Sequence, residues 1–221
     1  MEHLQIALFG ARSPLVVEYE ETCIRRGLTI RAAISVSGTP RVQDMSTVMS
    51  LDELTDDVLQ TPFLPVAFAP KRRAEHHDAA LKLGMTPAEA LVDPTSVLPR
   101  SLRIGAGSFI NAAAVVGAVT RIGRGVLVNR AVSIGHHCVI GDFVSIGPGA
   151  TLAGNIRVGQ GTMIGAGSVI LPDVRIGENC VIAAGSLVRK HVADGAFVAG
   201  NPAEVRQFDA GRSSLHLEGG E

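Results

Sequence analysis

One position in every six carries a branched aliphatic side chain from Val92 to Val188. All 17 consecutive positions in this register are Ile, Leu or Val. If a third of all residues were of these types, chance would fill the register about once in 10⁸ trials. Helices repeat their buried face every 3.6 residues and strands every 2, so neither explains the pattern. A period of six is typical of a β-solenoid, in which each repeat supplies one short strand and one corner.

Three such repeats close one triangular coil, so the register predicts between five and six coils that pair as parallel strands about 4.8 Å apart. The residue four places after each aliphatic is mostly small or branched, as at Val126, Cys138 and Val144, and is expected to point inward with it. Gly, Asn or Asp often lies one or three places after the aliphatic, where we expect corners with positive φ. Aromatic residues make up only 4% of the chain, in agreement with an aliphatic core. We predict a left-handed parallel β-helix without inserted loops.

The first 90 residues lack this repeat and have a pattern of alternating strands and helices. Strands are expected at residues 5–9, 28–36 and 63–69, and helices at 14–26, 50–59 and 71–83, the second opened by a Ser50–Glu53 capping box. This order predicts a small parallel sheet with helices packed on it. We therefore divide the chain into a Rossmann-like α/β domain over 1–90, a β-helix over 91–193, and a C-terminal cap with a loosely ordered tail over 194–221.

Charge and composition narrow the partners. The net charge is −1, and no basic run exceeds residues 71–73, which argues against nucleic acid or an anionic membrane as partner. Three widely spaced cysteines fit a reducing compartment better than a disulfide framework or a metal site. No signal peptide or membrane-spanning segment is visible. A cytoplasmic protein is expected.

The outward positions of the β-helix hold one column of interest, with His136 followed one coil later by Gly154 and three coils later by Lys190. An exposed imidazole beside a missing side chain would leave space for a substrate. Three coils span about 14 Å, so a long ligand with a reactive end and a phosphate end could bridge His136 and Lys190. The alternative is that His136 and His137 are two polar residues on a solvated face.

The remaining histidines and the cysteines do not indicate a second functional site. A zinc hydratase on this fold needs three converging histidines, and only residues 136 and 137 lie in mid-solenoid, so no metal is expected. Cys138 and Cys180 occupy inward positions and should be core residues. His76 and His77 are expected at the surface of the third helix.

The runs 134–143 and 147–155 and the segment 197–203 resemble the sialic-acid and bacillosamine-pathway sugar acetyltransferases, and the resemblance covers nearly the whole chain. It implies a homotrimer with acetyl-CoA in the groove between neighbouring β-helices. It also implies that His136 is the general base, with His137 beside it. The cofactor residues expected from the resemblance and the column geometry are Ser145, Gly154, Ala166, Ala184 and Lys190.

Three departures from the family stand out. The residue after the base is commonly acidic, but here it is His137, so a carbonyl or Asp142 could have to orient the base instead. The Gly-rich loop after the first strand is replaced by residues 10–15, where Gly10, Arg12 and Ser13 are the expected acceptor contacts and Pro14 removes an amide. The acidic pair usual after the second strand is missing as well. Our hypothesis is that the acceptor differs from the usual UDP-amino sugar or binds differently.

The sequence thus predicts an enzyme that moves an acetyl group from acetyl-CoA to an amine or hydroxyl of a small acceptor. A nucleotide-linked amino or deoxy sugar is the expected acceptor. Acetylation of another small molecule and a non-catalytic β-helix that serves as a trimerisation module are the alternatives.

Overall fold

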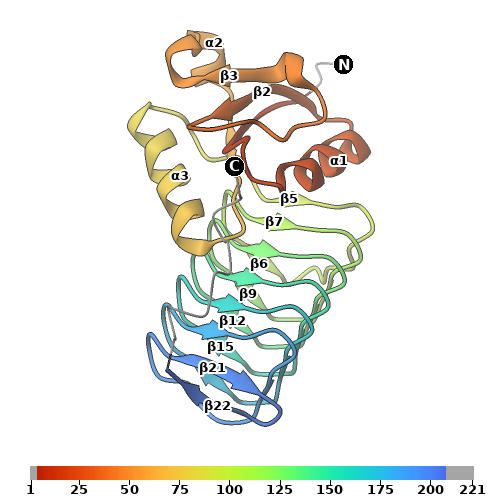
Figure 1. The fold of residues 1–221 in the computed structure, drawn as a ribbon. Coiled ribbons are helices and arrows are strands. Elements are labelled where there is room, and N and C mark those ends of the chain that lie inside the picture. The colour runs from red at the N-terminus through yellow and green to blue at the C-terminus, as the bar shows by residue number, and fades with distance from the viewer. Residues whose placement is uncertain (1–3, 208–221) are drawn as a thin grey trace.

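The computed structural model describes residues 4–207, an α/β domain followed by a long three-sided solenoid (Figure 1). The α/β domain holds a four-stranded parallel sheet in the order β3–β2–β1–β4. Its strands are β1 (Gln5–Phe9), β2 (Thr29–Ser35), β3 (Val48–Ser50) and β4 (Phe63–Pro65). Its helices are α1 (Val16–Arg26), α2 (Asp56–Leu59) and α3 (Pro70–Lys82).

Most of these elements lie where the sequence predicts them, with three differences. Strand β3 was not predicted, because three half-buried residues carry too little periodicity to be recognised. Strand β4 ends at Pro65, and the remainder of the predicted third strand is a loop that leads into α3. The Ser50–Glu53 capping box is present, but it opens a 3₁₀ turn rather than α2.

The solenoid has three parallel faces whose strands pair with the residue 18 places further on, such as Leu127 with Ser145. The predicted left-handed parallel β-helix is confirmed. The first face contains β5 (Leu91–Val92), β7 (Phe109–Ile110), β10 (Leu127–Val128), β13 (Ser145–Ile146), β16 (Met163–Ile164), β19 (Val181–Ile182), β21 (Phe197–Gly200) and β22 (Ala203–Arg206).

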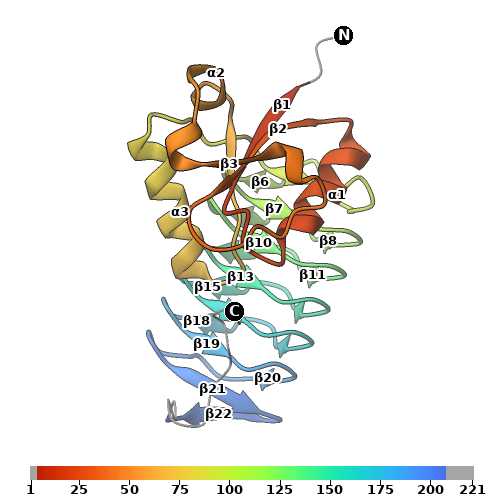
Figure 2. The same ribbon diagram turned by 45° about the horizontal axis from the view of Figure 1, so that its top comes forward.

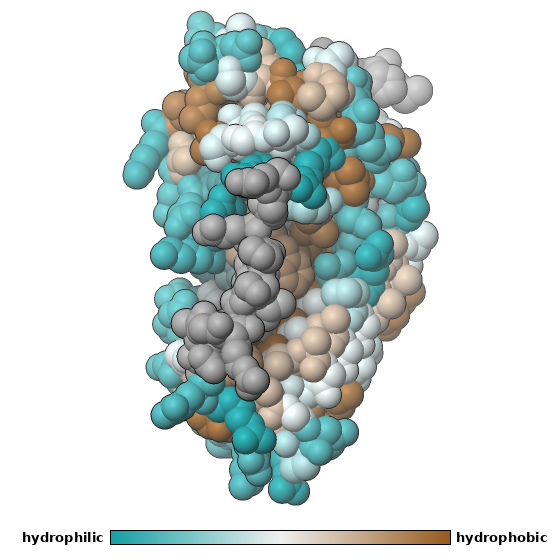
Figure 3. All heavy atoms as spheres, in the orientation of Figure 1, coloured by the Kyte–Doolittle hydropathy of each residue, from teal (hydrophilic) through white to brown (hydrophobic). Residues whose placement is uncertain are grey.

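The other two faces have five strands each. The second face contains β8 (Val115–Val116), β11 (Ser133–Ile134), β14 (Thr151–Leu152), β17 (Val169–Ile170) and β20 (Leu187–Val188). The third face contains β6 (Arg103–Ile104), β9 (Arg121–Ile122), β12 (Val139–Ile140), β15 (Arg157–Val158) and β18 (Arg175–Ile176). Figure 3, in the same orientation as Figure 1, shows hydrophilic and hydrophobic side chains mixed along the outside of the solenoid.

Glycines occur at two positions of the repeat, one and three places after the aliphatic, and the structure requires them for different reasons. Every residue three places after a register aliphatic, from Gly107 to Gly185, has a positive φ, including His137 at 58°. Glycines one place after the aliphatic do not, so the expectation of positive φ is wrong for them. They are required by close approach between coils: a Cβ at Gly135 would lie 2.6 Å from the carbonyl carbon of Ala153. The first use concerns the backbone conformation and the second the spacing between coils.

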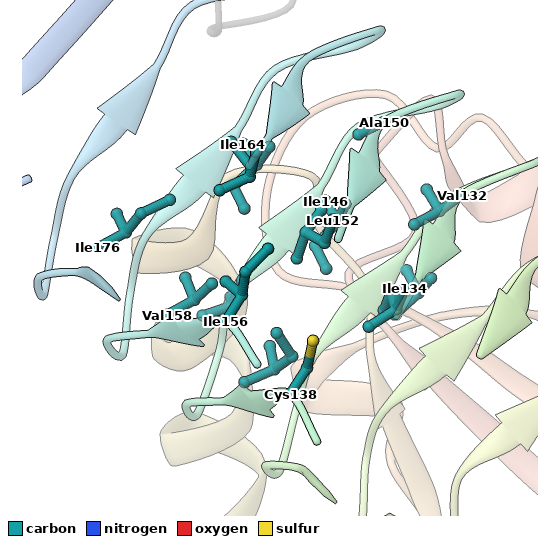
Figure 4. Packing of buried hydrophobic residues seen from close by; sticks show 14 of the residues in the cluster. Val132, Ile134, Cys138, Ile146, Ala150, Leu152, Ile156, Val158, Ile164 and Ile176 are labelled. Carbon is teal, nitrogen blue, oxygen red and sulfur yellow. The ribbon is translucent and has the colours of Figure 1, made fainter. Parts of the chain in front are cut away.

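The solenoid core is a stack of buried aliphatic side chains, as predicted (Figure 4). Cys138 and Cys180 are fully buried within it, so both are core residues. Val192 and Val198 extend the core under the antiparallel β21–β22 hairpin at the far end. The tail predicted to be loosely ordered, 209–221, lies outside the described residues. None of the helices in the described part of the chain has the length and hydropathy that a membrane span requires.

The α/β domain packs on the first face of the solenoid, with α1 and α3 on either side of β7, β10 and β13 in the view of Figure 2. Tyr19 of α1 lies with its ring 4.1 Å from that of Phe109, and both belong to one buried cluster. His77 of α3 packs between Phe63 and Phe143, with ring centroids 5.7 and 5.3 Å away. The expectation of a surface position is therefore wrong for His77, which lies on the face of α3 that packs on the sheet and the solenoid, whereas His76 is half-buried.

Candidate active site

His136 lies at the corner between the second and third faces, on the turn that joins β11 to β12. Its side chain is exposed, as is that of His137. Its backbone is held by a hydrogen bond from Asn155 N to His136 O of 2.8 Å, one coil further on. His136 is thus mounted on a hydrogen-bonded corner and not on a free loop.

His137 is the partner of His136. Their Nδ1 atoms are 3.0 Å apart and the rings stand edge to face. Only one of the two nitrogens can carry the proton in such a contact, so one ring donates and the other accepts. Asp142, the other orienting residue considered, instead receives hydrogen bonds from Arg124, from Nε at 2.8 Å and from the backbone N at 3.0 Å.

Gly154 stacks directly on His136. A Cβ at this position would lie 2.7 Å from Cε1 and 2.8 Å from Nε2 of His136. The space that the missing side chain leaves is therefore occupied by the imidazole itself, and not by the room for substrate that the column suggested. Glycine is required because any side chain would displace the ring.

The other predicted cofactor residues fall into two groups. Lys190 is exposed at the same corner as His136 and lines a cavity of about 340 Å³ against the β21–β22 hairpin, with His191, Val198 and Glu204. Ala166 and Ala184 are exposed at the corner between the first and second faces. These two corners flank the second face, so one chain does not bring the groups together.

Ser145 does not fit its predicted contact with the cofactor. It is fully buried on the first face, where its Oγ donates to the carbonyl of Phe68 at 2.6 Å and accepts from Arg73 Nη1 at 2.8 Å. The covering α/β domain leaves it no accessible surface. Ser145 joins the two parts of the chain.

Gly10, Arg12 and Ser13 line a cavity of about 360 Å³ in the α/β domain. Gly10 has φ 119°, and a Cβ there would lie 2.5 Å from Nδ1 of His76 and collide with the Val66 carbonyl, so only glycine fits. His76 Nδ1 lies 3.0 Å from that carbonyl and donates to it. Burial lowers the pKa of His76. The ring is therefore neutral at neutral pH, and its Nε2 is left as an acceptor.

Among the residues of this cavity that sequence reasoning missed are its other two arginines, Arg41 and Arg72, and its histidine, His76. They follow the second strand or lie on the helix after the fourth, and the carboxyl ends of parallel strands meet at one edge of a sheet. That rule could have indicated them. With Arg12 they give the cavity three guanidinium groups, and none of the lining residues is acidic. The cavity therefore suits an anionic ligand.

Comparison with known proteins indicates a class of transferases built on hexapeptide repeats, which fits the solenoid described above. The family model described as bacterial transferase hexapeptide (six repeats) matches residues 119–154 and 155–190. No curated protein matches the chain. Within residues 4–207, no three His, Cys, Asp or Glu side chains are grouped as metal ligands.

Solved structures resemble the chain over nearly its whole length. The acetyltransferase domain of PglB from Neisseria gonorrhoeae FA1090, in complex with acetyl coenzyme A, is 28% identical, with 92% of this chain and 100% of that one covered and a TM-score of 0.80. WeeI from Acinetobacter baumannii AYE is 27% identical, with 91% and 99% covered and a TM-score of 0.75. PerB from Caulobacter crescentus, in complex with CoA and GDP-perosamine, is 22% identical, with 94% and 99% covered and a TM-score of 0.82. The last supports the fold alone. The predicted resemblance to hexapeptide-repeat sugar acetyltransferases is confirmed, and with it the class of enzyme, an acetyltransferase.

Proposed function

We propose that this enzyme transfers the acetyl group of acetyl-CoA to an amine or hydroxyl of a small anionic acceptor, with His136 as general base. A nucleotide-linked amino or deoxy sugar is the acceptor that the cavity in the α/β domain fits best. The observation that carries the proposal is the His136–His137 contact beside Gly154. The PglB domain, with acetyl coenzyme A bound, supports the choice of donor.

The chemistry is a direct transfer. His136 Nε2 takes the proton of the acceptor amine or hydroxyl while that atom attacks the thioester carbonyl. The carbon–sulfur bond then breaks and the CoA thiolate leaves. For Nε2 to be free, the Nδ1 proton of His136 must point at His137 Nδ1, 3.0 Å away. His137 thereby fixes the tautomer of the base, a role that an acidic residue plays in the family. General-base catalysis of this kind contributes about 10²–10⁴ in rate.

The donor is proposed to lie along the solenoid corner, from His136 to Lys190. Three coils separate these residues, about 14 Å along the axis. At the far end, Lys190 and His191 border the cavity of about 340 Å³, whose other walls are mainly apolar. A phosphate beside Lys190 and a nucleoside in the cavity would account for both features.

A homotrimer would complete the site. The second face exposes valine side chains, with Val97 at 62%, Val115 at 47% and Val169 at 38%, which suits contact with another copy. Packing there would bring the Ala166–Ala184 corner of one copy to the His136 corner of the next. Moreover, the α/β domain covers the first face, opposite the corner that carries His136. The acceptor cavity of one copy would therefore serve the base of its neighbour.

The test is the rate of CoA thiol release with nucleotide-linked amino sugars as acceptors. His136→Ala is expected to lower kcat by about 10²–10⁴ with an unchanged affinity for acetyl-CoA. Gln160→Ala is the matched control, because Gln160 is exposed at the same place in a hexad of the neighbouring corner. Unchanged turnover in His136→Ala would exclude the proposed base. Absence of acetyl-CoA binding to the unaltered protein would favour the trimerisation module instead.

A further inference from the structure

Arg73 of α3 is a fully buried side chain that makes contacts with both parts of the chain. Its Nη1 donates to the carbonyls of Ala67 at 2.7 Å and Phe68 at 3.1 Å, in the loop between β4 and α3. Its Nε donates to the carbonyl of Gly125 at 2.6 Å, and its Nη2 to those of Phe143 and Val144 at 2.9 and 3.0 Å. The side chain thus spans the α/β domain and two coils of the solenoid.

This guanidinium has no carboxylate beside it. All its acceptors are backbone carbonyls apart from the Ser145 hydroxyl, and it is in no ion pair with a described residue. A buried charge loses its hydration, and well-packed apolar side chains of similar size often stabilise a protein as much or more. Burial lowers the pKa of Arg73 to about 10, so the group is still charged at neutral pH. The guanidinium therefore contributes through its geometry, because its planar fork of N–H donors fixes several carbonyls at once.

Two of the fixed carbonyls, those of Ala67 and Phe68, belong to residues in the wall of the acceptor cavity. Ala67, Phe68 and Ala69 line that cavity, and Arg72, next to Arg73, contributes one of its guanidinium groups. The same fork is anchored in the solenoid, whose corner carries His136. Ser145 strengthens the link by donating to Phe68 while accepting from Arg73. Apolar packing and ion pairs elsewhere also join the two parts of the chain, but the cluster formed by Arg73, Ser145 and the loop 67–69 ties the cavity wall itself to the solenoid.

We propose that Arg73 is a positioning residue for the acceptor: its hydrogen bonds hold the acceptor cavity in register with the solenoid of the same chain and, through the proposed trimer, with the base of the neighbouring copy. The inference rests on the proposed function, because it takes the cavity to be the acceptor site. Arg73 touches neither acceptor nor cofactor. Its effect should therefore be confined to acceptor binding and alignment, because the proposed acetyl-CoA site lies along the solenoid corner from His136 to Lys190.

The experiment compares Arg73→Met, Arg73→Lys and Ser145→Ala by steady-state kinetics and by calorimetry with UDP, GDP and dTDP as probes. Misplacing reacting groups by about 1 Å costs about 10² in rate. We expect kcat/KM for the acceptor to fall about 10²-fold in Arg73→Met and nearly as far in Arg73→Lys, because lysine lacks the fork. Ser145→Ala should lose about tenfold. The KM for acetyl-CoA should stay within about twofold in all three, which shows that the solenoid is intact.

Arg157→Met is the matched control, because Arg157 is exposed on the third face and pairs with no described carboxylate; it should change nothing. Full activity in Arg73→Lys with loss only in Arg73→Met would overturn the inference, since charge and not geometry would then matter. Equal loss of affinity for acetyl-CoA and acceptor would also overturn it, as the sign of general unfolding. If the unaltered protein binds no nucleotide, the acceptor assignment itself fails. Nucleotide binding and turnover that are identical in all variants would refute the role of Arg73 alone.

Discussion

Replacing Gly154 by alanine adds a single carbon directly beside the imidazole of His136. The new Cβ would lie 2.7 Å from Cε1 of His136 and 2.8 Å from Nε2, the atom proposed to take the proton. Non-bonded carbon atoms pack at about 3.5–4.0 Å, so the ring has to retreat by about 0.8 Å or more. The backbone of Gly154 is not in the positive-φ region, so it accepts alanine without strain of its own.

The expected loss follows from that displacement. A misplacement of about 1 Å at a reacting group costs about 10² in rate, or about 2.7 kcal/mol of transition-state stabilisation. The contact between His136 and His137 would also be disturbed, because the two rings share a hydrogen bond of 3.0 Å. We expect Gly154→Ala to retain its fold and to lose about 10² in kcat.

The assay is a double-mutant cycle on kcat with Gly154→Ala, His136→Ala and the two combined. If the methyl group acts through the imidazole, the double variant is no slower than His136→Ala, because the displaced ring is already gone. A double variant slower by the product of both losses would refute the reasoning. The methyl group would then act elsewhere, for instance on the cofactor.

Three further predictions follow from the contacts of the two sites. His137→Ala should lower kcat about tenfold, because His136 loses its hydrogen-bond partner. His137→Asn keeps an acceptor and tolerates the positive φ of 58°, so it should retain most activity, and equal losses in the two variants would contradict the orienting role. Arg41→Ala and Arg72→Ala should each weaken nucleoside diphosphate binding about 10–100-fold in calorimetry and leave acetyl-CoA binding unchanged; loss of both affinities would argue against separate sites. Burial lowers the pKa of His76 below its ordinary 6.5, so the unfolded chain binds more protons than the folded one as the pH falls, and the free energy of unfolding should decrease below about pH 6.5. His76→Asn keeps a donor toward the Val66 carbonyl and should reduce this pH dependence in urea titrations at pH 5 and 7. An unchanged pH dependence would count against a buried neutral ring.

The β-helix could be predicted from the sequence because its contacts are local in a simple way. Each residue meets the one 18 places away, so the aliphatic register identifies the core, the strand positions and the stacking of His136 on Gly154. The same rule places Lys190 at the corner of His136. The α/β domain was predicted nearly as well where periodicity and caps were strong, and strand β3 was missed where they were weak.

The site was only partly predictable. Gly10, Arg12 and Ser13 were indicated by their place after the first strand, and the structure finds all three around one cavity. The sequence could not show that Arg41, Arg72 and His76 complete it, because they come from segments that meet only when the sheet forms. Nor did it show which residue faces His136 Nδ1, since side-chain directions at a positive-φ corner depend on the local turn.

By itself, the sequence determined the solenoid, its register and the corner that carries the histidine pair. The reason is that, in a repeat of six residues with three repeats per coil, residues 18 positions apart are neighbours on successive coils. Only the tertiary structure decided which face the α/β domain covers. That docking buries Ser145 and His77, gives Arg73 its solenoid acceptors and puts the α/β domain with its arginine-lined cavity on the first face, opposite the corner that carries His136. The physical reason is that these contacts join residues about 70 positions apart with no period between them. They arise from packing between surfaces, which no pattern along the chain records.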